Sequence, residues 1–135
     1  MEPTLDFDSK SIQRDLFRMN TIASISEQLK LFRDERDWQK FHTVKDLAAA
    51  ISIEASELQE LTLWKSVDEI NISLNDEEFR TNIEEECADV LNYLILISHE
   101  VGFDLLDVAV EKIKKNGEKY PVNKSKGVAT KYNKL

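Results

Sequence analysis

The chain has 135 residues and a net charge of −8, with three glycines and two prolines. This length suits one domain, and so few helix-breaking residues favour helices with short connections. The acidic balance argues against a basic stripe for nucleic acid, and no apolar run reaches the ~20 residues that cross a membrane. The N-terminus has no basic segment before an apolar one, so we expect a cytoplasmic protein. Together these features predict an all-α protein that binds neither nucleic acid nor membrane.

Residues 1–20 form an N-terminal arm in this interpretation. A short helix over Ser9 to Met19 and a frayed arm are both compatible with its weak apolar spacing. The apolar period of the next segment predicts a helix that begins near Ser24 or Ser26 and ends at about Arg36.

The second predicted helix begins after Thr43. Thr43 has the character of an N-cap residue, and Asp46 three positions later resembles the partner residue of a capping box. The apolar period continues to about Leu63. The stretch from Trp64 to Asn75 has mixed character, and we expect it to be irregular.

The third predicted helix is capped by Asn75 or Asp76 and reaches about Val101. Gly102 is placed to end it, because glycine accepts the left-handed backbone that often follows a helix. The second and third helices both have apolar faces too broad for a single partner. We therefore expect a four-helix-bundle-like fold whose core is completed by homo-oligomerisation.

A fourth predicted helix is capped by Asp104 and ends at Pro121, which cannot continue it. After Pro121 the sequence is rich in lysine, serine and asparagine and is expected to be extended. The predicted organisation is thus an arm over 1–20, one all-α domain over 21–121 and a tail over 122–135.

Two pairs of acidic residues stand out within the apolar pattern: Glu54 with Glu57, and Glu86 with Asp89. The spacing of three residues places both carboxylates of a pair on one helix face. An acid on a buried face is costly unless it is neutralised, and four such acids suit a hard divalent cation. Solvated glutamates at the edge of an acidic bundle are the simpler alternative.

The ligand types decide between metals. A di-iron bundle needs a histidine three residues after a glutamate in two helices, and neither His42 nor His99 follows a glutamate of these pairs at that spacing. Ligation by oxygen alone favours Mg²⁺, with Mn²⁺ as a substitute. The chemistry this predicts is attack of a metal-positioned water on a phosphate ester.

An ordered set of landmarks extends over about residues 25 to 132: Phe32-Arg33-Asp34-Glu35-Arg36-Asp37-Trp38, Phe41-His42, Glu54-x-x-Glu57-Leu58, Leu63-Trp64-Lys65, Glu86-x-x-Asp89-Val90-Leu91-x-Tyr93, and Lys112-Ile113-x-x-Asn116-x-x-Lys119-Tyr120-Pro121. With these landmarks the chain resembles the MazG-type, all-α nucleoside triphosphate pyrophosphohydrolases, and among them the dCTP pyrophosphatases. Ile53 precedes Glu54 where the broad MazG pattern has a glutamate, a departure that the dCTP branch shares.

The resemblance implies Mg²⁺-dependent release of a nucleoside monophosphate and pyrophosphate. It implies that the four acids bind the metal, and we take Glu57 as the general base and Glu54 as the second catalytic residue. It also favours a tetramer built as a dimer of dimers. The substrate contacts expected from the aromatic, amide and basic landmarks are Trp38, His42, Trp64, Tyr93, Lys112, Asn116, Lys119 and Tyr120.

The most specific function that the sequence predicts is hydrolysis of dCTP or a modified dCTP in the nucleotide pool. Tyr93 lies one turn beyond Asp89, where its ring supports a deoxyribose and disfavours a 2′-hydroxyl. Two alternatives stay open: a deoxynucleoside triphosphate hydrolase of broader specificity, and a helical oligomer that binds nucleotides without hydrolysing them.

Overall fold

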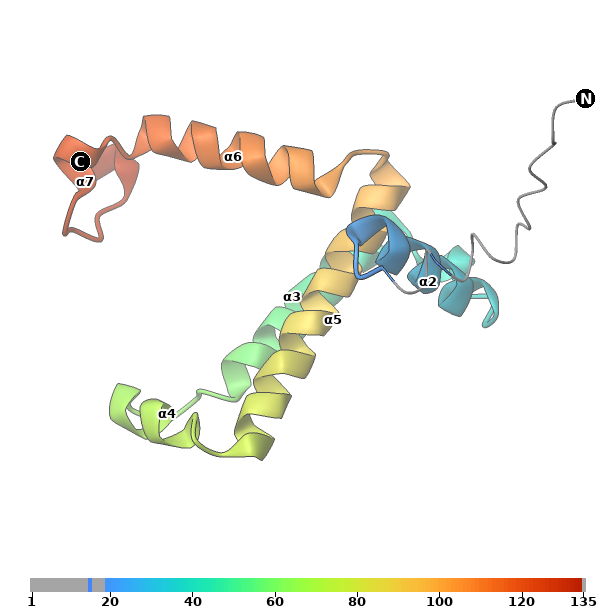
Figure 1. Cartoon of the computed structure of the whole chain (residues 1–135), viewed down its shortest axis with the longest axis horizontal. Helices are drawn as coiled ribbons and strands as arrows, with labels where there is room; N and C mark the ends of the chain where they lie inside the picture. Colours follow the sequence, from blue (N-terminus) through green and yellow to red (C-terminus); the bar gives the residue numbers. More distant parts are fainter. Residues whose placement is uncertain (1–14, 16–18, 135) are drawn as a thin grey trace, which may run out of the picture. The chain divides into compact units, whose positions relative to one another are not determined.

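The structure, a computed structural model, describes residue 15 and residues 19–134 (Figure 1). These residues contain helices and no strand, as the sequence predicts for an all-α protein. The helices and 3-10 turns are α2 (Ile22–Asp34), η1 (Gln39–Phe41), α3 (Val44–Glu60), α4 (Val67–Ser73), α5 (Glu77–Val101), α6 (Leu105–Lys119), α7 (Val122–Ser125) and η2 (Tyr132–Lys134). The short helix considered over Ser9 to Met19 falls almost wholly outside the described residues.

The packing of α3 against α5 is the main tertiary contact, and α2 packs against α5 as well (Figure 1). The most buried apolar side chains are Leu47, with 2% of its surface exposed, Ile95 with 1% and Leu96 with 6%. They come from the first half of α3 and the second half of α5. The core therefore lies near the C-terminal half of α5 and holds the two long helices together.

Three of the helices begin at caps that the sequence indicates, whereas α2 begins at Ile22 with Thr21 as its cap, before the predicted start near Ser24 or Ser26. The hydroxyl of Thr43 accepts the N–H of Asp46 (3.2 Å), and the side chain of Asp104 accepts the N–H of Asp107 (2.9 Å). Asp76 accepts the N–H of Phe79 at 3.1 Å, which selects it as the cap of α5. Each bond satisfies a backbone donor that the first turn of a helix leaves free.

We expected the stretch from Trp64 to Asn75 to be irregular, and this prediction is wrong. The stretch contains the helix α4. A complete capping box starts this helix: the N–H of Glu69 donates to the Ser66 hydroxyl (3.2 Å), and the N–H of Ser66 donates to the Glu69 carboxylate (2.6 Å). The pattern serine-x-x-glutamate is a sequence signature of a helix start. The mixed composition of the stretch concealed this signal.

Residues from Gly102 onward form a separate compact unit. Gly102 has a φ of 83°, the left-handed value expected at the end of α5. The tail that we predicted to be extended instead folds back on the end of α6. There the rings of Tyr120 and Tyr132 meet edge to face with centroids 6.0 Å apart, and the Ser125 hydroxyl donates to the carbonyl of Tyr120 (3.0 Å).

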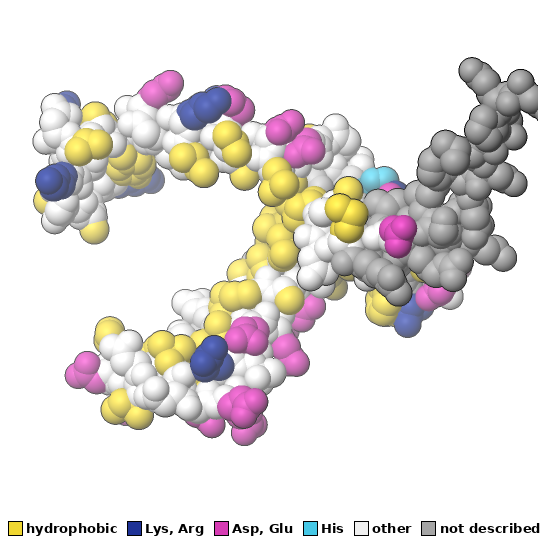
Figure 2. Space-filling model, viewed as in Figure 1, with side chains coloured by type: hydrophobic (Ala, Val, Ile, Leu, Met, Phe, Trp, Pro, Cys, Tyr) yellow, Lys and Arg dark blue, Asp and Glu magenta, His cyan; other side chains and the backbone are white. Residues whose placement is uncertain are grey.

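Large apolar side chains remain exposed on both units. In the unit that ends at Val101 they include Ile53, Val67 and Ile72, and Figure 2 shows hydrophobic side chains gathered along α5 on the viewed face. Within the described residues, no helix combines the length and apolar character that would carry it across a lipid bilayer.

Replacing Ser66 with alanine tests the capping box. We expect Ser66→Ala to destabilise α4 by about 0.5–2 kcal/mol, because the backbone N–H of Glu69 loses the Ser66 hydroxyl as its acceptor. Amide hydrogen exchange should become faster in α4 and stay unchanged in the second half of α5. Ser73→Ala is the control, since it removes a hydroxyl from the last turn of the same helix. Equal exchange in Ser66→Ala and the parent protein would contradict this role.

Candidate metal centre and adjoining pocket

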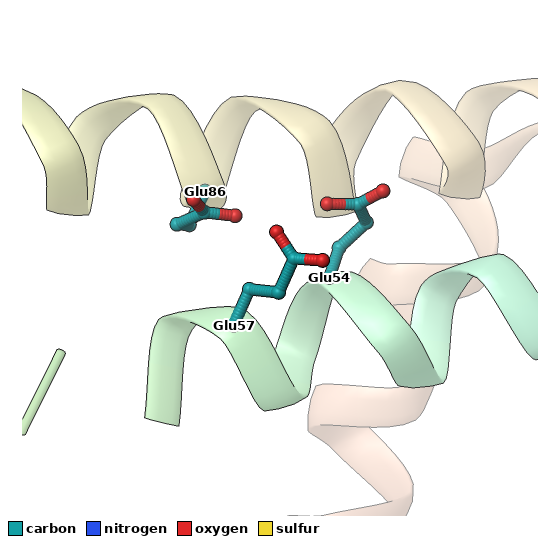
Figure 3. A group of neighbouring side chains, drawn as sticks. All are labelled: Glu54, Glu57 and Glu86. Carbon is teal, nitrogen blue, oxygen red and sulfur yellow. The ribbon is translucent and has the colours of Figure 1, made fainter. Parts of the chain in front are cut away.

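Three carboxylates meet where α3 and α5 pack together. Glu54 and Glu57 come from α3 and Glu86 comes from α5, and one oxygen of each lies within 4.8 Å of the others. Figure 3 shows the three carboxyl groups pointing toward one another in the space between the two helices. Glu54 and Glu86 are half-buried, whereas Glu57 is exposed.

The local fold explains this convergence. Glu54 and Glu57 are three residues apart on α3, so both side chains leave the helix on one face. Helix α3 packs against α5, and Figure 3 shows both side chains pointing toward α5. The apolar contacts that hold the helices together therefore hold these acids opposite Glu86.

Charge repulsion and burial both act on the cluster. Burial raises the pKa of Glu54, and the charges of Glu57, Asp89 and Glu86 raise it further. Burial also raises the pKa of Glu86, with added repulsion from Glu57, Asp89 and Glu85. These are the shifts expected when carboxylates share a site without a neutralising cation.

The cluster fits a divalent cation. One oxygen of Glu86, Oε2, is buried and has no hydrogen-bond partner. None of the ion pairs found between residues 19 and 134 involves Glu54, Glu57 or Glu86. An unpaired buried oxygen beside two further carboxylates is a donor set that suits a hard cation with oxygen ligands.

Asp89, the fourth ligand expected from the sequence, lies outside this group of three. Its side chain is exposed, yet its charge raises the pKa of Glu54 and Glu86, so it lies near them. Asp89 also lines a neighbouring pocket. It therefore stands between the acidic cluster and that pocket.

The neighbouring pocket has a volume of about 300 Å³ and aromatic walls. Its lining residues come from α2, α5 and the segment between α2 and α3; they are Leu29, Phe32, Trp38, His42, Asp89, Asn92, Tyr93 and Leu96. The sequence had singled out Trp38, His42 and Tyr93 as substrate contacts, and the structure brings these three together. We name this set the aromatic pocket.

The sequence reasoning missed Phe32 and Asn92 as pocket residues. Asn92 is three residues after Asp89, so helical spacing places the two on one face and could have identified it. Phe32 follows Leu29 by three residues, so the spacing alone predicts a place on the apolar face of this helix. The fold turns this side chain, which is half exposed, toward Trp38.

A tight turn after α2 places Trp38. The N–H of Trp38 donates to the carbonyl of Arg33 (3.0 Å) and that of Asp37 to the carbonyl of Asp34 (3.1 Å), the paired bonds of a Schellman motif. Asp37 has a φ of 53°, the left-handed value that this motif requires. The Phe32 and Trp38 rings then meet edge to face at 5.9 Å, the apolar contact that accompanies such motifs.

His42 and Tyr93 both line the aromatic pocket in their neutral forms. Burial and then the charge of Arg33 lower the pKa of His42, against opposing effects of Glu100 and Asp34, and its Nδ1 has no hydrogen-bond partner. Burial, Glu54 and Asp89 raise the pKa of Tyr93. At neutral pH the pocket therefore presents an uncharged imidazole and an uncharged phenol.

Among the predicted substrate contacts in the unit that ends at Val101, Trp64 does not line this pocket. Trp64 is 93% exposed, has a φ of 63° and lies outside the pocket lining. Four further residues share a helical spacing of i, i+4, i+7 and i+8 at the end of α6, in the unit that begins at Gly102; they are Lys112, Asn116, Lys119 and Tyr120. Their side chains are exposed.

Comparisons with known proteins agree on one family. The sequence profile of the MazG-like family matches residues 49–135. The dCTP pyrophosphatase 1 of Mus musculus is 38% identical over 115 residues, which are 85% of this chain and 68% of the mouse protein. The human protein of the same name is 33% identical over a span of the same length. A solved pyrophosphatase from Archaeoglobus fulgidus matches 70% of this chain and 87% of its own, with 41% identity and a TM-score of 0.65.

Neutralising one acid should stabilise the metal-free protein. The pKa of Glu54 is raised on folding, so its ionised form disfavours the folded state above that pKa, and this effect disappears as pH falls through it. We expect Glu54→Gln to raise Tm near neutral pH, by about 3–5 °C for each kcal/mol of repulsion removed, and to abolish stabilisation by Mg²⁺. Glu84→Gln, on the exposed side of α5, is the control. A lower Tm together with intact Mg²⁺ stabilisation would contradict the cluster as a cation site.

Metal binding should weaken as pH falls. Because the pKa values of Glu54 and Glu86 are raised, protons compete with a cation at higher pH than for an ordinary glutamate. Titration with Mn²⁺, followed by its electron paramagnetic resonance signal, should give an affinity that falls as the pH is lowered from neutral, starting at a higher pH than at a site built from ordinary glutamates. If the affinity for Mn²⁺ does not change as the pH is lowered from neutral through the ordinary titration range of glutamate, these carboxylates do not bind the ion.

Proposed function

The chain belongs to the MazG-like family, and from this premise we propose that it hydrolyses dCTP or a modified dCTP to the monophosphate and pyrophosphate. It is a nucleoside triphosphate pyrophosphohydrolase by its similarity to two proteins named dCTP pyrophosphatase 1 and to a solved pyrophosphatase. One observation carries the finer proposal. The acidic cluster lies beside a pocket with aromatic walls, and Asp89 lies between them.

The cation of the proposal is Mg²⁺, with Mn²⁺ as a substitute. Glu54, Glu57 and Glu86 supply the converging oxygens, and Asp89 is close enough to contribute a fourth. A bound Mg²⁺ supplies positive charge against the triphosphate and lowers the pKa of the attacking water. The acidic chain needs this charge, because the cluster itself repels a polyanion.

The two catalytic glutamates have different roles. Glu57 is the exposed member of the cluster, so its carboxylate is accessible to water and takes the proton as general base. Glu54 is half-buried between α3 and α5 and fixes the geometry of the cluster. Both residues come from one face of α3. The helix therefore keeps the general base Glu57 at a constant distance from the metal ligand Glu54.

The aromatic pocket takes the nucleoside. The Trp38 ring offers a face on which a base stacks, a contact worth about 1–3 kcal/mol. The side-chain amide of Asn92 has a donor and an acceptor for the edge of a base, and His42 adds an uncharged imidazole. The half-buried phenol ring of Tyr93 supports the deoxyribose and disfavours a 2′-hydroxyl.

The working enzyme in this proposal is a homotetramer built as a dimer of dimers. The exposed apolar side chains on both units support association, since a lone chain leaves them in water. Trp64 and the basic residues of α6 are then assigned to sites completed by association. Lys112 and Lys119 are suited to contact the phosphates of substrate.

A panel of nucleotides tests the proposal. We expect Mg²⁺-dependent pyrophosphate release from dCTP, little from the other seven common nucleoside and deoxynucleoside triphosphates, and none in EDTA. Glu57→Gln should lower kcat by about 10²–10⁴-fold with the fold intact, because a general base contributes that much. The exposed Glu84→Gln is the matched control.

Other outcomes would redirect the proposal. Similar rates on several bases would replace dCTP specificity with a broader deoxynucleotide hydrolase. Thermal stabilisation by nucleotides without pyrophosphate release would indicate a binding protein. Full activity of Glu57→Gln would remove this residue from the catalytic centre.

A further inference from the structure

Arg33 is the one charged side chain that is buried among the described residues, with only 4% of its surface exposed. It lies in the last turn of α2. A buried guanidinium is strongly unfavourable unless carboxylates and hydrogen bonds compensate it. A buried arginine outside the acidic cluster therefore calls for a structural reason.

The guanidinium joins two helices. Its Nε donates to Asp34 (2.8 Å) on its own helix, and its Nη1 donates to Glu100 (3.2 Å) in the last turn of α5. Asp34 is half exposed and Glu100 is about one-third exposed, so the bond to Glu100 is the more shielded of the two. This ion pair ties the end of α2 to the end of α5.

The ion pair lies next to the aromatic pocket. Leu96, which lines the pocket, is four residues before Glu100, so it occupies the preceding turn on the same face of α5. On α2, Phe32 precedes Arg33 and also lines the pocket. Arg33 is close enough to His42 for its charge to lower the pKa of that residue.

The backbone of Arg33 also serves the pocket. Its carbonyl accepts the N–H of Trp38 at 3.0 Å, the bond that closes the turn before the indole ring. The side chain of Arg33 binds Glu100 on α5, and the carbonyl of Arg33 binds the backbone of Trp38. The position of the ring relative to α5 therefore depends on both bonds.

We propose that the ion pair between the buried Arg33 and the partly exposed Glu100 positions the wall of the aromatic pocket and thereby sets its selectivity among nucleotide bases. Arg33 is a positioning residue: it acts through Phe32, Trp38 and His42. The link to base selectivity rests on the proposed function. The link to the placement of Trp38 does not, and it is tested separately.

The first test uses fluorescence and needs no substrate. The chain has two tryptophans, so Trp64→Phe leaves Trp38 as the only one. In this background Arg33→Met and Glu100→Gln should each shift the emission of Trp38 to longer wavelength and increase its quenching by acrylamide. Arg80→Met, which removes an exposed arginine 4.0 Å from Glu84, should change neither.

The second test uses kinetics with natural Trp64. Arg33→Met and Glu100→Gln should raise KM for the preferred nucleotide by roughly ten- to a hundredfold, since small displacements in a site have effects of this size. With kcat unchanged, this is the signature of lost substrate binding. The ratio of kcat/KM between dCTP and dTTP should move toward one, while the affinity for Mn²⁺ stays that of the parent.

These results separate the two proposals. Emission and KM of a folded Arg33→Met identical to those of the parent would overturn the positioning role. If Arg33→Met does not fold, the Trp38 emission and the KM of Glu100→Gln decide instead. If no nucleotide is hydrolysed by the parent, the proposed function fails and the fluorescence result still decides the role of Arg33.

Discussion

Electrostatic repulsion at the packing interface of α3 and α5 is the constraint on which the other features depend. Glu54, Glu57 and Glu86 have oxygens within 4.8 Å of one another, and the protein tolerates this because Leu47 and Ile95 hold the two helices together elsewhere along their length. The acidic cluster and the apolar core thus lie at different places along the helix pair, and this separation has an advantage. Apolar packing supplies stability at one end of the helix pair, which leaves the other end free to hold groups whose mutual repulsion destabilises it in the absence of a cation.

The helix α5 connects the two halves of the candidate site. Glu86 belongs to the acidic cluster, whereas Asn92, Tyr93 and Leu96 line the aromatic pocket, and Asp89 lies near both. A nucleotide has the same two parts, an anionic phosphate chain and an aromatic base. One continuous helix fixes the distance between the groups that would bind each part, so no hinge motion is needed to bring them together.

Much of this arrangement is predictable from sequence because it is local. Helical spacing identified both acidic pairs, and caps such as Thr43, Asp104 and Gly102 lie where the sequence predicts. Contacts between different helices and turns were harder to predict from the sequence. Spacing within α2 placed Phe32 on an apolar stripe but did not reveal that a turn returns Trp38 to it. The capping box that begins α4 was present in the sequence and was overlooked, because the surrounding composition is mixed.

The left-handed backbone of Asp37 has a consequence for ligand binding. Glycine is the usual residue at such a position, and it would leave this turn many alternative conformations. Aspartate reaches fewer of them, and its carboxylate also pairs with Lys40 at 2.5 Å across the next turn. The orientation of the Trp38 ring is thus restricted before any ligand arrives. In the proposed function, a base that stacks on this ring would lose less conformational entropy than on a ring that must first be ordered, so rigidity in one surface turn would contribute to affinity without an added contact.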